Sequence, residues 1–161
     1  MVRSLVDELE ASENQGTKSH TVPTIMILTP DTANSMAISK TLTEAYPLKD
    51  TSLKYLVKVH RLFSKGMKVE DQKAHLKMKN KDKVLNIYVG VPNRMRKLQS
   101  DDAFDIGIQS DRFKYMLIDC SANSKSYSIF EVKETRVDTL ELIKLSSTAL
   151  DRGSLKLILC K

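Results

Sequence analysis

The sequence contains few of the residues that hold small disulfide-rich or zinc-binding domains together. Its 161 residues include only two cysteines, Cys120 and Cys160, without a C-x-x-C spacing, and three scattered histidines. A disulfide framework needs more paired cysteines, and a structural zinc site needs clustered Cys or His ligands. We therefore expect neither of them, and we expect a reducing compartment, the cytosol or the nucleus.

Long hydrophobic runs are also missing from the chain. No apolar run approaches the roughly 18 to 20 residues that a membrane-spanning helix needs. Residues 1–14 carry acidic side chains where a signal peptide would have a basic end followed by an apolar stretch. The pattern predicts no membrane segment, no secretory signal and no membrane partner.

Glycine is scarce, which bears on nucleotide chemistry. The five glycines form no G-x-x-x-x-G-K-[ST] loop and no other glycine-rich fingerprint, so no segment is expected to cradle nucleotide phosphates. No Ser/His/Asp or Cys/His grouping suggests a nucleophile, because His20, His60 and His75 fall in an expected linker, strand and Lys-rich helix. We expect no catalytic residue, no cofactor and no ATP binding.

Positive charge is present in excess, and it is concentrated in one part of the chain. The net charge is +6, but residues 54–97 hold 13 Lys or Arg against Glu70, Asp71 and Asp82, a local excess of ten. Such asymmetry predicts a surface that faces a polyanion, nucleic acid first and an acidic membrane or protein second. The alternative is a solvated basic helix and loop without a partner.

The length and composition fit one soluble domain, with 41% hydrophobic and 29% charged residues. Residues 1–20 are polar and predict a short helix over 2–10 followed by a linker, which leaves 21–161 as the domain. There, short apolar runs alternate with stretches of helical period. We expect strands at 23–28, 55–62, 84–89, 113–118 and 155–160, and helices at 30–45, 68–78, 92–98 and 134–150.

This alternation is typical of βαβ crossovers. It predicts an α/β fold with a mainly parallel five-stranded sheet and helices on both faces. The runs at 24–28 and 155–159 are almost continuously apolar, as strands buried on both faces should be. Helical spacing predicts that two apolar stripes face the core: Ala33, Met36, Ala37 and Leu42 in the first domain helix, and Val137, Leu140, Ile143 and Leu145 in the last.

In such a sheet, the loops that follow the strands share one edge, where ligands bind. Two of these loops place Pro30 and Pro92 near the first helical position, so both helices should aim free N–H groups at that edge. Arg94 then lies in the first turn, where the helix dipole disfavours a cation, so we expect its side chain to meet an anion there. The alternative is that Arg94 is merely solvated. A third loop places Lys65 beside Gly66, and the glycine permits the backbone of a ligand to approach closely. The alternative is that this loop is a plain tight turn.

These loops, taken in order, resemble the first RecA-like domain of a DEAD-box RNA helicase. Leu28-Thr29-Pro30 stands where that family has P-T-R-E-L, and Ser64-Lys65-Gly66 where it has a Gly-Gly turn. Val91-Pro92-Asn93-Arg94 stands where it has T-P-G-R, and Asp119-Cys-Ser-Ala122 where it has Asp-Glu-Ala-Asp.

The departures from the helicase pattern are informative. Cys120 replaces the catalytic glutamate, Asn93 replaces a glycine, and the Walker lysine is absent. A degenerate helicase domain with the runs Arg61–Val69 and Val89–Met95 closely resembles the Cms family of helicase-like proteins of the small-subunit pre-ribosome. The resemblance covers residues 23–161, and that family has a longer tail ahead of this domain, so the chain is expected to be a fragment or a short relative.

The resemblance implies a degenerate RecA-like three-layer sandwich without helicase activity, working in the nucleus and nucleolus on pre-ribosomal RNA or snoRNA together with processome proteins. It carries RNA-backbone contacts over to Thr29, Pro30, Lys65, Gly66, Pro92, Asn93 and Arg94. Two alternatives remain open. One is a nucleotide-hydrolysing fragment whose nucleotide grip lies elsewhere, and the other is a purely protein-binding scaffold.

Overall fold

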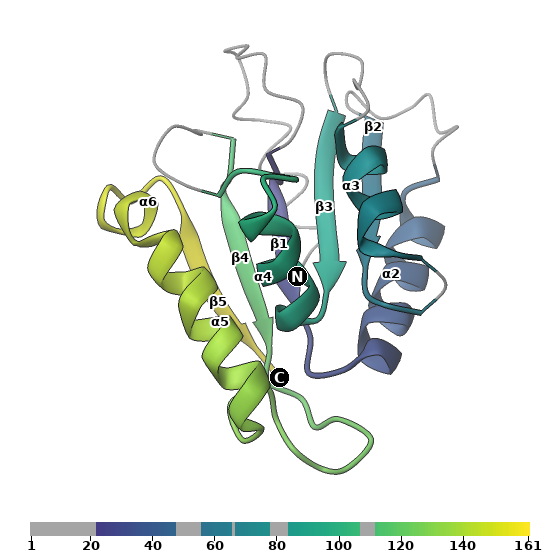
Figure 1. The fold of residues 1–161 in the computed structure, drawn as a ribbon, viewed down its shortest axis with the longest axis vertical. Helices are drawn as coiled ribbons and strands as arrows, with labels where there is room; N and C mark the ends of the chain where they lie inside the picture. The colour runs from purple at the N-terminus through teal and green to yellow at the C-terminus, as the bar shows by residue number, and fades with distance from the viewer. Residues whose placement is uncertain (1–21, 48–55, 66, 78–83, 107–111) are drawn as a thin grey trace.

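The fold is built on one parallel sheet, seen in a computed structural model that describes residues 22–47, 56–65, 67–77, 84–106 and 112–161 (Figure 1). Five strands, β1 to β5, pair in the order β2-β3-β1-β4-β5, and every pairing is parallel. They span Ile25–Leu28, Leu56–Leu62, Val84–Gly90, Tyr115–Asp119 and Lys156–Cys160. The predicted helix over 2–10 lies outside the described residues.

Helices fill the connections as the alternation predicted. They are α2 (Thr32–Ala45), α3 (Val69–Lys77), α4 (Pro92–Ser100), α5 (Lys133–Leu145) and α6 (Ser147–Asp151). The predicted helix 134–150 is thus two helices, which meet at Ser146. All five strands and the helices among the described residues lie within three residues of the predicted bounds, and the α/β sandwich is confirmed.

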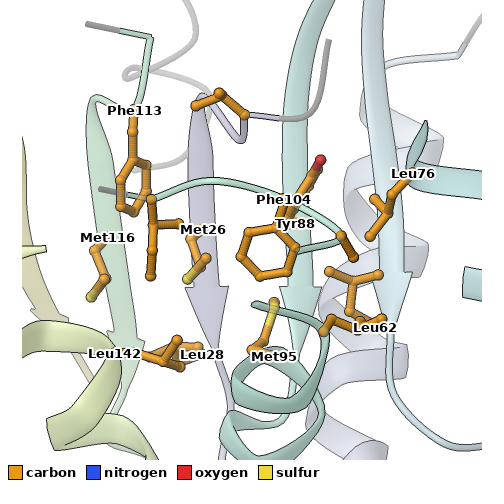
Figure 2. Close-up of a cluster of buried hydrophobic side chains, with 14 of the residues drawn as sticks. Met26, Leu28, Leu62, Leu76, Tyr88, Met95, Phe104, Phe113, Met116 and Leu142 are labelled. Atoms are coloured by element: carbon orange, nitrogen blue, oxygen red, sulfur yellow. The ribbon is translucent and has the colours of Figure 1, made fainter. Parts of the chain in front are cut away.

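Helices cover both faces of the sheet, with α2 on one face and α3, α4 and α5 on the other (Figure 1). On the second face, Met26 and Leu28 of β1 meet Met95 of α4, Leu142 of α5 and Tyr88 of β3 (Figure 2). These side chains are at most 1% exposed. On the first face, Leu42 of α2 packs in a second cluster with the other side of the same strands. None of the described helices is long and apolar enough to cross a membrane.

The predicted core stripes of the helices differ from the observed ones at most positions. In α2, Leu42 is buried as predicted, but Ala33, Met36 and Ala37 are exposed, and Ser35 and Ser39 complete the buried face. In α5, Val137, Leu140 and Leu145 are exposed and Ile143 is half-buried, whereas Thr139 and Leu142 are buried.

The reason for this error is chemical. A buried hydroxyl costs little when a backbone carbonyl accepts its proton. The Ser39 Oγ donates to the carbonyl of Ser35 (2.7 Å), and the Thr139 Oγ1 donates to the carbonyl of Thr135 (2.6 Å). Small hydroxyl residues therefore face the sheet, and a search for apolar side chains alone misses them.

The last strand departs from prediction as well. β1 is fully buried, as expected for an apolar run inside the sheet. β5 is apolar apart from Lys156 but lies at the edge of the described sheet, and Leu157 and Leu159 are 39% and 63% exposed. The prediction that both runs are buried on both faces is correct for β1 and wrong for β5.

Truncation of two leucines of α5 tests the corrected phase of the helix. Leu142→Ala should lower the free energy of unfolding by about 2 to 5 kcal/mol, because it leaves a cavity in the core. Leu140→Ala, the matched control at a position 52% exposed, should change it by less than about 0.5 kcal/mol. Urea unfolding of both variants measures the difference, and a larger loss at Leu140 would contradict the assignment of the buried face.

Candidate nucleic-acid interface

The loops that carry the predicted contacts lie at one edge of the molecule. Because β1, β2, β3 and β4 are parallel, their carboxyl ends point the same way, and the loops after them gather at the lower edge in Figure 1. Gly90 fixes how closely two of them approach. A Cβ atom at Gly90 would lie 2.0 Å from the carbonyl oxygen of Leu62, so only glycine allows β2 and β3 to end side by side.

The first of these loops is folded inward. Thr29 is fully buried, and its hydroxyl donates to the carbonyl of Asp31 (3.1 Å) and lies against the Ser35 hydroxyl. Pro30 is also buried, and it precedes the N-cap Asp31 rather than opening the helix as predicted. The carboxylate of Asp31 accepts from the N–H of Asn34 (2.8 Å), so this helix terminus is already capped. In this geometry the Thr29 hydroxyl is not available to a ligand.

The second loop is open, in contrast to the first. Pro92 is the first residue of α4, as predicted, but it is buried, so only backbone groups next to it can meet a ligand. No side chain caps this helix at Val91, and the first helical N–H with a backbone partner is that of Met95. The N–H groups of Asn93 and Arg94 therefore point out of the helix end, where the dipole favours an anion.

Gln72 of α3 positions Arg94, and no pattern in the sequence pointed to this residue. The side chain of Gln72 is 2% exposed, and its Nε2 donates to the carbonyls of Phe63 (3.0 Å) and Arg61 (3.2 Å). Its Oε1 accepts from Nη1 of Arg94 (3.3 Å). One amide thus joins α3, the loop after β2 and the first turn of α4. The half-buried Arg94 is held toward the loop that carries Lys65.

Lys65 and the neighbouring Lys68 are exposed in that loop, while Gly66 lies outside the described residues. Among the described residues, neither lysine has a carboxylate within ion-pair distance. Other cations of the basic stretch are already used, since Lys73 pairs with Asp101 (3.4 Å) and Arg96 pairs with Glu141 (3.8 Å). Lys65 and Lys68 are thus among the exposed cations of the basic stretch that have no carboxylate partner in the described part of the chain.

The fourth loop is tied to α2 through Asp119. One oxygen of this carboxylate accepts from Nδ2 of Asn34 (3.3 Å), and the other from the N–H of Ser121 (3.0 Å). Asn34 Nδ2 also donates to the Ser121 hydroxyl (3.0 Å), and Asp31 accepts from the N–H of Ser124 (3.1 Å). A carboxylate that a nucleotide hydrolase would direct at magnesium is here engaged with the chain's own amide groups.

The Cys160 thiol at this end of the sheet is not activated. Cys120 and Cys160 are free, and the N–H of Cys120 donates to the carbonyl of Cys160 (2.7 Å). Partial burial raises the pKa of the Cys160 thiol, and the nearby Asp119 carboxylate raises it further. A raised thiol pKa keeps the sulfur protonated and poorly nucleophilic.

The segment from Asp119 to α5 ends in a compact loop that the sequence did not single out. The Asn123 side chain accepts from the N–H groups of Lys125 (2.8 Å) and Tyr127 (3.0 Å), and Ser126 adopts a positive φ of 64°. The N–H of Ser128 bonds the carboxylate of Glu131 and lowers its pKa. Tyr127 is 51% exposed on this loop, so its ring offers a face on which a base can stack.

His60 of β2 lines a pocket together with Gln72, and its contacts are with neighbouring core residues. It is buried, its Nε2 lies 3.0 Å from Oδ1 of Asn86, and its ring packs edge-on against Tyr88. Burial lowers the pKa of His60 to about 4, with smaller lowering effects from Lys58 and His75 and an opposing effect of the Asn86 hydrogen bond. A small pocket of about 160 Å³ lies beside it, lined by Val59, His60, Arg61, Leu62, Met67, Gln72, His75 and Leu76.

The lowered pKa of His60 predicts acid sensitivity. Below its ordinary pKa of 6.5 the unfolded chain binds a proton at this site, whereas the folded chain does so only near pH 4. The free energy of unfolding should therefore fall by about 3 kcal/mol between pH 7 and pH 4 on account of this group. In urea unfolding at several pH values, His60→Gln should lose this part of the slope, and the exposed-site control His75→Gln should retain it. Equal slopes for the two variants would refute the assignment.

Comparison with known proteins identifies the family. No curated protein matches the sequence significantly. A family model described as CMS1, U3-containing 90S pre-ribosomal complex subunit, matches residues 4–159. This span covers nearly the whole chain, including every described strand except the last residue of β5, and it confirms the predicted Cms family. The chain therefore belongs to the family of U3-containing 90S pre-ribosomal complex subunits.

Proposed function

We propose that this protein is a non-catalytic assembly factor of the small-subunit pre-ribosome in the nucleolus, and that its loop edge binds the phosphate backbone of single-stranded RNA. Membership of a 90S pre-ribosomal complex family supports the ribosome-biogenesis role. The RNA partner would be pre-ribosomal RNA or snoRNA. The helicase resemblance would then reflect an inherited binding edge without the nucleotide chemistry.

The observation that carries the RNA proposal is the open N-terminus of α4 beside Arg94. Its open N–H groups, the guanidinium held by Gln72 and the exposed Lys65 and Lys68 would together bind phosphate oxygens. Asn93 is exposed at the same terminus, and its side chain donates a 3.3 Å hydrogen bond to Asp138. Thr29 is left out of this site because its hydroxyl is buried and internally bonded.

Recognition at this site would not depend on sequence. Phosphate contacts position a nucleic acid without reading its bases, and an exposed Tyr127 would stack on any base. The contacts proposed are few, so the affinity should be weak and strongly salt-dependent. Single strands are favoured because a duplex hides the base faces that an aromatic ring needs.

Lys65→Glu is the cleanest test of the RNA site. Arg94→Glu is less suitable, since it would also leave the buried Oε1 of Gln72 without its donor. Lys65→Glu should lower the affinity for a labelled single-stranded oligonucleotide several-fold and reduce the log-log salt slope by about 0.7. The melting temperature should not change.

Lys114→Glu is the matched control, because it makes the same charge change at the start of β4, the opposite end of the sheet. It should reduce the salt slope much less than Lys65→Glu does. Equal losses for the two variants, measured by fluorescence anisotropy, would mean that only net charge matters and that the loop edge is not the binding site. Strong discrimination between oligonucleotides of equal length would also contradict the proposal.

The non-catalytic part of the proposal is tested with nucleotide. Adding magnesium and ATP should leave the melting temperature unchanged, because a ligand that binds the folded state must raise it. The motivation is the missing Walker loop and the engagement of Asp119 by Asn34 and Ser121. A rise in melting temperature, or an ATPase rate that disappears in Asp119→Ala, would instead favour the nucleotide-hydrolase reading.

A further inference from the structure

The pocket of about 160 Å³ between β2 and α3 lies close to the loop edge. On the strand it is lined by residues 59–62, which are the last four residues of β2. On the helix it is lined by Gln72, His75 and Leu76, whose i, i+3, i+4 spacing places them on one face of α3. The pocket therefore lies at the carboxyl end of the sheet, where the loop that carries Lys65 begins.

Gln72 connects this pocket to the proposed phosphate site. Its side chain lines the pocket, and its Oε1 accepts from Nη1 of Arg94 at 3.3 Å. Met67, which also lines the pocket, lies in the chain between the exposed Lys65 and Lys68. A nucleotide whose phosphate binds these cations would therefore have its base close to the pocket.

The pocket has a buried apolar part and an exposed opening. Leu62 and Leu76 are each 2% exposed, whereas Met67 is 42% exposed and His75 is exposed as well. The pocket is thus open to solvent beside Met67 and His75. A cavity of about 150 Å³ holds one six-membered ring. There is therefore room for a pyrimidine, or for the six-membered ring of a purine, but not for a whole nucleoside.

The side chains at the opening are of the types that hold an unstacked base. Bases turned out of a single strand stack on aromatic rings, histidine included, and methionine sulfur makes favourable contacts with aromatic rings. The His75 ring lies beside that of His60, with ring centroids 6.2 Å apart and an interplanar angle of 70°. Burial lowers the pKa of His60 to about 4, so near pH 7 the inner part of the pocket holds a neutral imidazole.

The charge around the opening favours a nucleotide over an apolar side chain of a protein partner. Arg61, Lys65 and Lys68 are all exposed on the β2 side of the pocket. The acids in the first turn of α3, Glu70 and Asp71, fall outside the helix face that lines the pocket. An apolar side chain alone would leave the cations unused. A nucleotide uses both parts of the surface, because its phosphate meets the cations and its base fits the apolar space.

We propose that this pocket binds one unstacked base of the single-stranded RNA whose phosphates meet Arg94, Lys65 and Lys68. This inference rests on the proposed RNA function and adds a base contact to it. The base would stack on the ring of His75, and the side chain of Met67 would close over it from the loop side.

The pocket would accept any base. The amide of Gln72 already donates to two backbone carbonyls and accepts from Arg94, so it is not available to read the edge of a base. Leu62 and Leu76 offer only hydrocarbon, and stacking on a ring tolerates every base. Binding by this pocket therefore agrees with recognition that does not depend on sequence.

His75→Ala tests the base contact, and His75→Phe is the matched control, because it keeps a flat ring. The full chain is titrated with two end-labelled strands of equal length, a single-stranded RNA and a sugar-phosphate strand that lacks every base. For the RNA, His75→Ala should lower the affinity about fivefold or more, the effect of losing one base stack. His75→Phe should stay within about twofold of the wild type. For the strand without bases, both variants should bind as the wild type does.

The comparison of the two strands isolates the base contact. Both strands meet the same protein, so an effect of His75→Ala on folding or on phosphate attraction appears with both and cancels. Equal losses for the two strands, or no loss for either, would overturn the pocket proposal. If Lys65→Glu weakens RNA binding while His75→Ala has no effect specific to the bases, the phosphate site stands and the base pocket is wrong. If the wild type does not bind RNA, both proposals are wrong.

Discussion

Parallel pairing of the strands is the constraint on which the rest of the molecule depends. A parallel strand cannot be joined to its neighbour by a hairpin, so each connection must cross a face of the sheet, and here helices make those crossings. The same pairing sends every strand-to-helix loop to one edge. It also leaves two outer strands, β2 and β5, whose backbone groups must be satisfied in some other way.

The first consequence is a loop edge at which the helices that follow β1 and β3 begin differently. Thr29 and Asp31 turn their polar atoms inward and cap α2, whereas α4 begins with a proline and no capping side chain. A helix end left uncapped at a surface has unsatisfied donors, which water or an anion must meet. The only guanidinium in the first turn of that helix is held in place by Gln72, a residue whose other bonds stabilise the edge of β2. The side-chain amide of Gln72 thus both protects the β2 edge of the sheet and positions Arg94.

The second consequence concerns Asp119. A carboxylate at the end of a parallel strand is well placed to hold a metal ion. The helicase resemblance matches Asp119 to the first residue of the Asp-Glu-Ala-Asp motif. Here Asn34 and Ser121 donate to it, and Asp31 holds the following loop through Ser124. A ligand that needed this carboxylate would have to break these bonds first. The segment that carries the exposed Tyr127 is thus tied to α2 through Asn34 and Asp31.

Sequence reasoning was accurate where the signal is local and repetitive. The strands were predicted because short apolar runs between turn residues have few other structures open to them, and Pro92 marked the start of α4. It was wrong where small polar residues occupy buried positions. Ser35, Ser39 and Thr139 are buried in the core, and their hydroxyls donate to backbone carbonyls. It could not find Gln72 or Asn34, because each is a single polar residue whose partners are distant in sequence.

The error at β5 has a different origin and is the most instructive. Its sequence is that of a strand buried on both sides, and the prediction of burial followed from that composition. The described fold places the strand at an edge, so the sequence and the isolated domain disagree about its surroundings. An exposed leucine on an edge strand normally favours unwanted pairing with other chains. At the β2 edge, this fold prevents such pairing with the hydrogen bonds from Gln72. Among the described residues no strand lies beyond β5, and composition alone does not distinguish such an edge strand from an interior one.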